Sequence, residues 1–298
     1  MRTTKRFSPK VLDRFRRQGR GQGLFQDYVP WHRIGRSDPS SRGRSHLQTW
    51  NGRHREVLSD HEWVILFFVL MLMNLVDFRE QFPLNHEEGF HELSPYLDEP
   101  PTLNFPGTLE LAKLLGIRHP KTRGDGESAN WIMSTDFLLT LLKPNGELEL
   151  LAISGKLEGE LEDKRTRELL SIEREYWKVR GVTWLLITPA LFEKEVALLL
   201  RMSMPWALGE PSNEDALKAA VTLASSCQGR SLTFLLQQLS NRLGDMELAQ
   251  RAFWQGVWNG KIPLDLRRGW RPHQPILLLD QDTFLALNPI VSRRSTWI

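Results

Sequence analysis

Cysteine is almost absent from this chain of 298 residues, which contains only Cys227. A single cysteine excludes an internal disulfide and any zinc site built from several cysteines, and it is typical of proteins in a reducing compartment. Long apolar runs are absent too. The longest one, "WVILFFVLMLMNLV" at 63–76, is too short to span a bilayer and includes Asn74, so we expect a buried helix there.

A secretory signal is also missing. The chain starts with the basic stretch "MRTTKRFSPKVLDRFRR", and no apolar core follows it. No segment repeats and none is of low complexity. We therefore expect a soluble, intracellular protein that makes no membrane contact.

Charge is unevenly distributed along the chain. Residues 1–55 hold 14 Lys and Arg against three Asp and Glu, whereas the whole chain has a net charge of only +3, so the rest is acidic. A basic segment on an acidic body is typical of contact with a polyanion, usually nucleic acid. The alternative is a solvated tail. Against it, Phe25, Tyr28 and Trp31 interrupt the basic segment, and such side chains favour docking on a surface.

The order of predicted elements indicates an α/β protein. A helix is predicted from Ser59 or Asp60, followed by a strand within 76–84 and a strand pair within 133–156. A second helix at 162–181 and a buried strand at 182–188 complete the set. Strands that alternate with helices in this way predict a mixed sheet flanked by helices.

The last third of the chain differs in pattern. Three amphipathic helices with tight turns are followed by two strand-like pieces, "KIPLDL" and "PILLLD". Three helices followed by a β-ribbon is the order of a winged helix, and a generic small α+β domain is the alternative. We predict three parts: a basic arm over 1–55, a catalytic core over 56–190 and a winged-helix-like domain over 191–298.

One acid interrupts the apolar strand pair "MSTDFLLTLLKPNGELELLAISGK" at 133–156. A buried charge is costly unless it is paired or holds a metal ion. If the turn is the three residues Pro144–Gly146, Asp136 opposes Ser154, and Lys156 lies diagonally on the same face. A two-residue turn would place Lys156 on the opposite face.

Carboxylates beside a lysine suit metal-assisted phosphodiester cleavage. Mg²⁺ needs hard oxygen ligands, and one or two carboxylates together with water and phosphate are sufficient. Asp136 supplies one carboxylate and Glu62, at the start of the apolar helix, is the candidate for the second. Lys156 would orient the attacking water. The alternative is an Asp136–Lys156 ion pair, which the spacing alone favours.

Several stretches resemble one family, the TnsA-type endonuclease subunit of heteromeric, Tn-seven-like bacterial transposases. They occur in order over residues 19–188: "GRGQGLFQDYVPW", "SSRGRSH", "LSDHEW", "VDFREQFPL", "IRHP", "MSTDF", "GK", "KRTRELLSIEREYW" and "WLLIT". Long words in the family's order make this a specific resemblance. The C-terminal part resembles the family only in its winged-helix-like pattern.

The resemblance implies a restriction-endonuclease-like core with a metal-dependent site. The catalytic residues of the family correspond to Glu62, Asp136 and Lys156, with Glu62, Asp136 and the carbonyl of Gly155 as metal ligands. Glu173 matches a family glutamate close to the site. The implied metal ion is Mg²⁺, with Mn²⁺ as a substitute.

The resemblance also implies partners. Proteins of this family cut the 5′ strands at transposon ends, an integrase-type transposase cuts the 3′ strands, and a AAA+ ATPase regulator binds the C-terminal domain. Double-stranded DNA at the transposon ends is therefore the expected substrate. The resemblance likewise implies a location in the bacterial cytoplasm, with association with the nucleoid when the protein is in its complex. The arginines that we expect to contact it are Arg14, Arg16, Arg17, Arg20, Arg42 and Arg44.

Two residues depart from the family pattern. Ser154 stands where the superfamily has an acid and this family a glutamine, which removes a potential ligand. Gly155 stands where a β-branched residue is usual, which loosens the strand but permits close approach of the backbone to a metal ion. A second hypothesis follows from them: a structural subunit that has lost cleavage and bridges DNA, transposase and ATPase.

Overall fold

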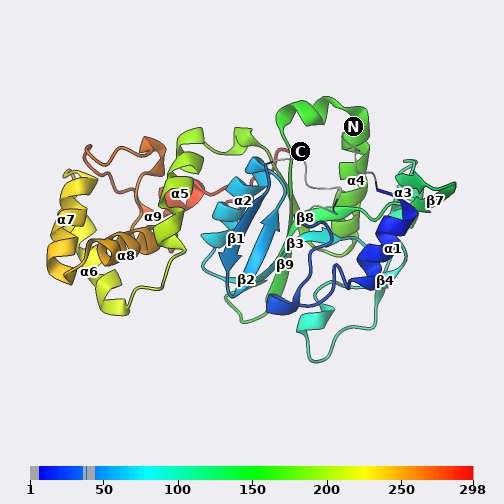
Figure 1. The fold of residues 1–298 in the computed structure, drawn as a ribbon, viewed down its shortest axis with the longest axis horizontal. Helices are drawn as coiled ribbons and strands as arrows, with labels where there is room; N and C mark the ends of the chain where they lie inside the picture. The colour runs from blue at the N-terminus through cyan, green and yellow to red at the C-terminus, as the bar shows by residue number, and fades with distance from the viewer. Residues whose placement is uncertain (1–6, 36–37, 39–43, 298) are drawn as a thin grey trace. The chain divides into compact units, whose positions relative to one another are not determined.

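Figure 1 shows the computed structural model, which describes residues 7–35, 38 and 44–297. These residues form two compact units. The first comprises the described residues up to Trp63, Asn74–Thr188 and Trp297, and the second comprises Val64–Met73 and Pro189–Thr296. The predicted division into arm, catalytic core and winged-helix-like domain stays a prediction. In the described part of the chain, no helix is long and apolar enough to cross a membrane.

A four-stranded mixed sheet forms the centre of the first unit. In spatial order its strands are β10 (Thr183–Ile187), β9 (Leu148–Gly155), β8 (Ser134–Leu142) and β3 (Leu75–Pro83). β10 runs parallel to β9, and the other neighbours are antiparallel. Parallel neighbours need a crossover connection, which α4 (Lys164–Val179) provides. The predicted α/β fold with a mixed sheet is therefore confirmed.

The β8–β9 hairpin has the three-residue turn, which is one of the two alternatives that the sequence leaves open. The pairs have the expected register, starting with Phe137 opposite Ile153 and continuing to the turn. Beside the turn, the Lys143 N–H donates to the Glu147 carbonyl oxygen at 2.8 Å. Gly146 completes the turn with a φ of +86°, which glycine adopts without steric cost. The register is thus the expected one as far as Phe137 and Ile153, where the pairing ends, so the expected Asp136–Ser154 pair is not part of the ladder.

Helix α4 covers one face of this sheet. Its residues Ile172, Tyr176 and Trp177 are fully buried and pack in one cluster with Leu138 of β8 and Ala152 of β9. The short helix α3 (Thr108–Leu114) lies against α4 and adds two more apolar side chains to the cluster. The face of the sheet under α4 is called the α4 face below.

The hairpin of β1 (His46–Trp50) and β2 (Arg53–Val57) packs on β3. The Arg55 guanidinium lies 4.2 Å from the centre of the Phe78 ring and donates to the Phe78 carbonyl oxygen at 2.7 Å. Arg53 forms an ion pair with the buried Glu80 at 2.6 Å. These contacts attach the end of the predicted basic arm firmly to the sheet.

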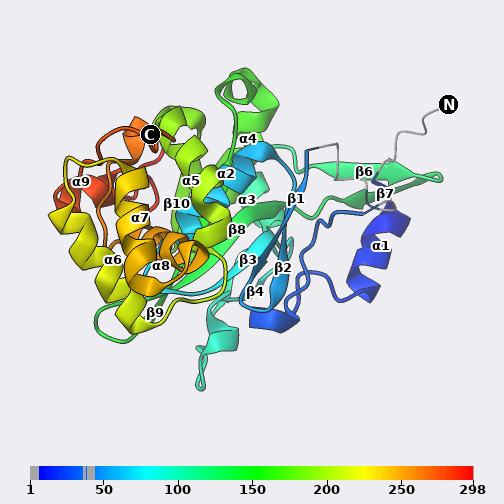
Figure 2. The same cartoon turned by 60° about the vertical axis from the view of Figure 1, so that its left-hand side comes forward.

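The first part of the basic arm is folded as well. Helix α1 (Pro9–Arg17) packs against the hairpin of β6 (Lys121–Gly124) and β7 (Glu127–Asn130), as Figure 2 shows. Phe15 and Trp31 are buried in a small cluster between them. Tyr28 and Trp31 of the arm are therefore buried, as the sequence indicates, whereas Phe25 is 40% exposed.

Short elements complete the first unit. They are η1 (Phe25–Asp27), β4 (Gly89–Phe90), η2 (Ser94–Tyr96), β5 (Asn104–Phe105) and η3 (Glu158–Glu162). β4 and β5 pair with each other outside the main sheet. These two strands lie in the segment between β3 and β8.

The second unit is mainly helical. Its helices are α5 (Lys194–Ala207), α6 (Glu214–Ser226), α7 (Leu232–Leu243), α8 (Met246–Trp258) and α9 (Gln281–Ala286), together with the 3₁₀ turns η4 (Pro189–Leu191) and η5 (Leu266–Arg268). The later part of α2 (Asp60–Leu70) also belongs to it. Phe67 packs against Trp258 with ring centres 5.9 Å apart, and the Asn288 amide donates to the Phe68 carbonyl oxygen at 2.9 Å.

The predicted β-ribbon of the second unit is reduced to a bridge between Leu264 and Leu278 among the described residues. The Asp265 N–H donates to the Leu277 carbonyl oxygen at 2.8 Å beside this bridge. Prolines in both predicted pieces, such as Pro263, lack the N–H that a longer ladder would need. The winged-helix assignment of this unit stays a prediction.

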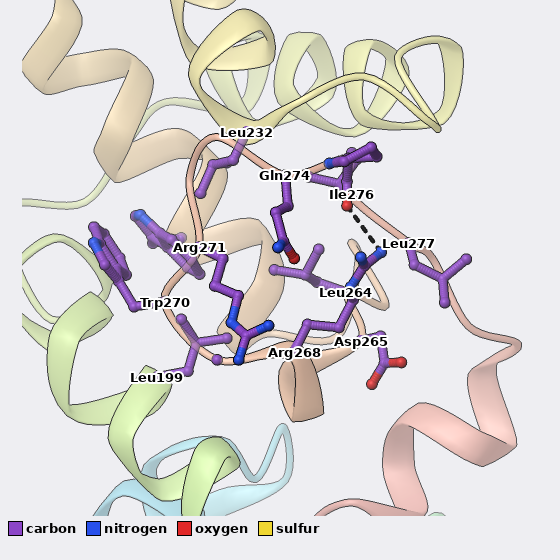
Figure 3. A pocket seen from close by; sticks show the side chains of 13 residues that line it. Leu199, Leu232, Leu264, Asp265, Arg268, Trp270, Arg271, Gln274, Ile276 and Leu277 are labelled. Carbon is purple, nitrogen blue, oxygen red and sulfur yellow. Dashed lines mark hydrogen bonds between the residues drawn. The ribbon is translucent and has the colours of Figure 1, made fainter.

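A small cavity lies inside the second unit and is shown in Figure 3. Leu232, Leu264 and Trp254 line it, and Arg268 closes one side by donating to the Pro275 carbonyl oxygen at 2.9 Å. Its volume of about 30 Å³ has room for one or two water molecules. The cavity is therefore a packing feature of this unit and too small for a ligand.

The buried His32 should make the first unit less stable at acidic pH. Its ring is buried between Phe7, Phe15 and Trp131, and burial lowers the pKa of His32 from 6.5 to about 4. Below pH 6.5 the unfolded chain therefore binds a proton at His32 that the folded state does not bind. The free energy of unfolding falls as the pH falls for this reason. Between pH 7 and pH 5 this histidine should remove about 2 kcal/mol of unfolding free energy.

The measurement is urea unfolding of the wild type and His32→Phe at pH 7 and pH 5. The pH-dependent loss should be smaller in His32→Phe by about 2 kcal/mol. Equal losses in the two proteins would show that His32 does not stay neutral in the folded state.

Candidate active site

Glu62 projects from the first turn of α2, where local hydrogen bonds fix its carboxylate. The Glu62 N–H donates to the Ser59 hydroxyl at 3.1 Å, and that hydroxyl is also bonded to Glu62 Oε1. The Leu58 N–H donates to Glu62 Oε2 at 2.9 Å. This reciprocal arrangement is close to a capping box, in which a Ser and the Glu three residues later satisfy free N–H groups. The helix start predicted at Ser59 is observed.

Asp136 lies near the start of β8, next to the end of β9. Its Oδ2 accepts the Gly155 N–H at 2.8 Å and lies 3.9 Å from the Lys156 ammonium. The ammonium itself donates to the Gly155 carbonyl oxygen at 2.9 Å. Lys156 thus interacts with Asp136 through charge but directs its hydrogen bond to the backbone. The ion pair that the spacing favours is present only in this loose form.

Gln81 joins the two carboxylates. Its side-chain nitrogen donates to Glu62 Oε2 at 3.0 Å and lies 3.4 Å from Asp136 Oδ1. The structure therefore brings Glu62, Asp136 and Lys156 together as predicted, and it adds a residue that the sequence analysis missed. A glutamine inside a strand has no special sequence signal, so only the structure could find it.

The backbone at Gln81 is also unusual. Gln81 has a φ of +50°, in the left-handed region that a residue with a side chain adopts at a cost on the order of 1–3 kcal/mol. In a regular strand, side chains three residues apart point to opposite faces. Here the Arg79 guanidinium lies 4.5 Å from the centre of the Phe82 ring, and Phe82 packs on the α4 face. Gln81 is the residue at which the alternation of β3 breaks.

The opposing strand β8 shows the same break. Leu138 packs on the α4 face, and three residues earlier Thr135 also contacts α4, because its hydroxyl accepts from the Trp177 indole N–H at 2.8 Å. Between them, Asp136 contacts Gln81 and Gly155 instead. The pairs on either side of Gln81 and Asp136 keep one register, so these two residues face each other across the strands.

Burial makes the carboxylate pair costly. Burial, with a further contribution from the charge of Asp136, raises the pKa of Glu62 to about 7. Burial lowers the pKa of Lys156, but the carboxylates around it, with Asp136 first, raise it by more, so the net pKa is raised and the ammonium stays charged. The site therefore holds two acids and one cation in a region that excludes much of the solvent.

Glu173 of α4 forms a second polar cluster next to this pair. Its Oε1 accepts the hydroxyls of Thr135 at 2.7 Å and Ser154 at 2.5 Å, and the Trp184 indole N–H lies 3.3 Å away. Burial raises the pKa of Glu173 to about 7. Ser154 is thus engaged by Glu173, and its hydroxyl is directed to α4 and not to Asp136.

The donor set suits a hard divalent cation. Glu62, Asp136 and the Gly155 carbonyl are all oxygen donors, and a carbonyl oxygen has a second lone pair beside the Lys156 hydrogen bond. Within the described residues, no group of three or more His, Cys, Asp and Glu side chains is placed to hold a metal ion. Two carboxylates and one carbonyl oxygen leave coordination positions around such a cation for water.

The predicted DNA-contacting arginines are dispersed. Arg16 and Arg17 are exposed on α1, Arg14 is partly buried there, and Arg42 lies outside the described residues. Arg44 is exposed and paired with Asp60 at 2.8 Å. Arg20 is buried: it pairs with Asp38 at 2.5 Å and stacks on the Phe15 ring, which favours a role in folding. Its contact with DNA stays untested.

A mixed sheet flanked by helices, with Asp136 and Lys156 at the ends of neighbouring strands and Glu62 on helix α2, is typical of restriction-endonuclease-like proteins. Residues 73–189 match the family described as "TnsA-like endonuclease N terminal". The chain is 32% identical over 210 residues to the transposon Tn7 transposition protein TnsA of Escherichia coli. That match covers 70% of this chain and 66% of the relative, which is just under two thirds of its length. Residues 73–189 therefore belong to the TnsA-like endonuclease family, and the chain is similar to a TnsA-type transposition protein over most of its length.

The carboxylate pair should make the free energy of unfolding depend on pH with the opposite sign to that of the His32 contribution. The folded pKa of Glu62 is about 7, above its usual value of 4.5, so the folded state retains a proton that the unfolded chain releases. The contribution of Glu62 to the free energy of unfolding is therefore present at pH 4.5 and is lost as the pH rises through 7. Raising the pH from 5 to 8 without divalent cations should cost up to about 3 kcal/mol through this residue.

Glu62→Gln should lose less stability than the wild type over the same pH range, as measured by urea unfolding in the presence of a chelator. Glu162→Gln removes an exposed carboxylate and serves as the control, with the wild-type slope. The same slope in all three proteins would mean that Glu62 is ionised throughout and that its environment is more polar than the structure indicates.

Proposed function

We propose that this protein is a metal-dependent DNA endonuclease that cuts the 5′ strands at transposon ends, while a partner transposase cuts the 3′ strands. The observation that carries the proposal is the convergence of Glu62, Asp136 and Lys156 from α2, β8 and the end of β9. Family membership supports the nuclease class, and the name of the E. coli relative supports a role in transposition.

Glu62, Asp136 and the Gly155 carbonyl would hold Mg²⁺, for which Mn²⁺ would substitute. When bound there, the ion would supply charge that lowers the pKa of water and offsets the growing charge on the phosphate. A cation held there would also offset the burial and the charge of Asp136, which together raise the pKa of Glu62.

Lys156 would act on the nucleophile and on the phosphate. Its ammonium is held by the Gly155 carbonyl and by the charge of Asp136, so it is positioned before substrate binds. From there it would orient the attacking water and stabilise the negative charge that grows on the phosphate oxygens. Its raised pKa keeps it charged at neutral pH, so it would act as an electrostatic group and not as a general base.

The hairpin β6–β7 would extend the DNA interface beyond the predicted arginines. Thr122 is buried and donates to the Phe7 carbonyl oxygen at 2.7 Å, so this face of the hairpin is anchored beside α1. Lys121 and Arg123, which alternate with Thr122, are exposed on the other face. They line an open groove with Arg118, and no carboxylate pairs with either of them among the described residues.

A structural subunit is the second candidate, and one observation favours it. Ser154 is bonded to Glu173, so it offers no ligand where related sites have an acid or an amide. In that case the chain would bridge DNA, the integrase-type transposase and the AAA+ regulator without cutting. Contact of the C-terminal domain with a AAA+ regulator rests on the family resemblance alone in either case, as does the cytoplasmic location.

The first test is strand cleavage at labelled transposon ends, with the transposase and ATPase partners and Mg²⁺ present. Asp136→Ala and Lys156→Ala should each reduce 5′ nicks by on the order of 10²–10³-fold and leave 3′ nicks intact, because the changed groups act only at the 5′ reaction. Lys143→Ala, at the other end of the same hairpin, is the matched control and should cut normally.

Two results would contradict the nuclease proposal. One is a wild-type complex that cuts the 3′ strands and leaves the 5′ strands whole, which is what the structural-subunit hypothesis expects. The other is normal 5′ cutting by Asp136→Ala, which would place the active site elsewhere.

The second test concerns the DNA interface. Lys121→Ala/Arg123→Ala should weaken binding of duplex DNA regardless of sequence, because phosphate contacts are electrostatic. The slope of log affinity against log salt should fall by about two, one for each lost phosphate contact. Fluorescence anisotropy with a labelled duplex at several salt concentrations measures both effects.

Lys218→Ala/Arg242→Ala removes one lysine and one arginine from α6 and α7 and is the matched control. If both double variants lower the slope equally, general charge explains the effect and the hairpin is not a defined contact.

A further inference from the structure

We propose that Gln81 is a positioning residue of the active site, which turns Asp136 toward Glu62 and sets the separation of the two carboxylates for a divalent cation. The inference rests on the proposed function and deepens it. Two independent features of Gln81 support it: its backbone conformation and the hydrogen bonds of its amide.

The backbone conformation of Gln81 determines the direction in which the side chains around it point. A regular β3 would place the side chain of residue 81 on the α4 face, together with Arg79, and Phe82 on the other face. The left-handed φ of Gln81 reverses this order, so Phe82 packs on the α4 face and Gln81 contacts Glu62. Asp136, opposite Gln81, departs from the alternation of its own strand in the same way.

The hydrogen bonds of the Gln81 amide determine the separation of the two carboxylates. One nitrogen donates to Glu62 and reaches Asp136, so the two acids are held by a single group of fixed size. Gln81 is only 3% exposed, and its carbonyl oxygen on the backbone accepts the Trp31 N–H at 3.2 Å, which anchors the strand at this point. Both carboxylates are thereby arranged before a cation arrives, and a preorganised ligand set binds more tightly.

Two near-isosteric substitutions separate a positioning role from a merely structural one. Gln81→Met keeps the length of the side chain and removes both N–H donors, so the carboxylates lose their link. Gln81→Glu keeps the shape and adds a third carboxylate at the same point. A structural role predicts that both changes affect cation binding in the same direction, whereas a residue that faces the cation site predicts opposite directions.

The measurement is binding of Mn²⁺ to the full chain at pH 8, followed by the electron paramagnetic resonance signal of free Mn²⁺. Gln81→Met should raise the dissociation constant by about tenfold, the size of effect that loss of a supporting group around a metal ligand typically has. Gln81→Glu should lower it below the wild-type value. Asn51→Gly changes another residue with positive φ, in the β1–β2 turn, and should bind Mn²⁺ as the wild type does.

The outcomes distinguish this inference from the proposed function. If the wild type binds Mn²⁺ and Asp136→Ala does not, the metal site is supported. The role of Gln81 alone would then be wrong if Gln81→Met had the wild-type dissociation constant. It would also be wrong if Gln81→Met and Gln81→Glu shifted the dissociation constant in the same direction. If the wild type shows no binding that depends on Asp136, the metal site and the inference fail together. Thermal unfolding of each variant verifies that the folded chain is compared.

Discussion

Two carboxylates that share a small, partly dry region of a protein repel each other and lose hydration, and this constraint shapes the first unit. The chain compensates with N–H donors aimed at the pair: Leu58 before α2, Gln81 inside β3 and Gly155 at the end of β9. Each donor requires its element to begin, bend or end at one position. The sheet, the helix start and the irregular strand therefore serve the same electrostatic need.

Glu173 extends this compensation to a second layer. The residue brings another buried acid close to the site, but hydroxyl and indole donors from β8, β9 and β10 surround its Oε1. Ser154 has its place in that layer. Its hydrogen bond to Glu173 holds α4 against the sheet. Lys156 balances part of the negative charge of both layers.

Local signals, namely apolar runs, a Pro-Asn-Gly turn and a capping serine, predict the strands, the hairpin and the start of the helix that carries Glu62. The sequence alone makes Glu62 only a candidate partner of Asp136 and Lys156, whose meeting is implied by the family resemblance. It does not predict the break of alternation at Gln81. That break depends on what lies on each face of β3, such as the contact of Phe82 with the α4 cluster, and this is tertiary information. Simple alternation likewise pairs Ser154 with Asp136, whereas the tertiary contact with Glu173 directs its hydroxyl to α4.

The path of α2 has a practical consequence for dissecting this protein. Its first turn carries Glu62 in the first unit, while Val64–Met73 belongs to the second, where Phe67 and Phe68 have their partners in Trp258 and Asn288. The two units are therefore interleaved in the sequence and cannot be separated by one cut. A fragment that ends near residue 190 would keep the acid but leave an apolar helix without its packing partners. A chimera made from two relatives would therefore have to take this helix segment and the C-terminal portion from the same parent.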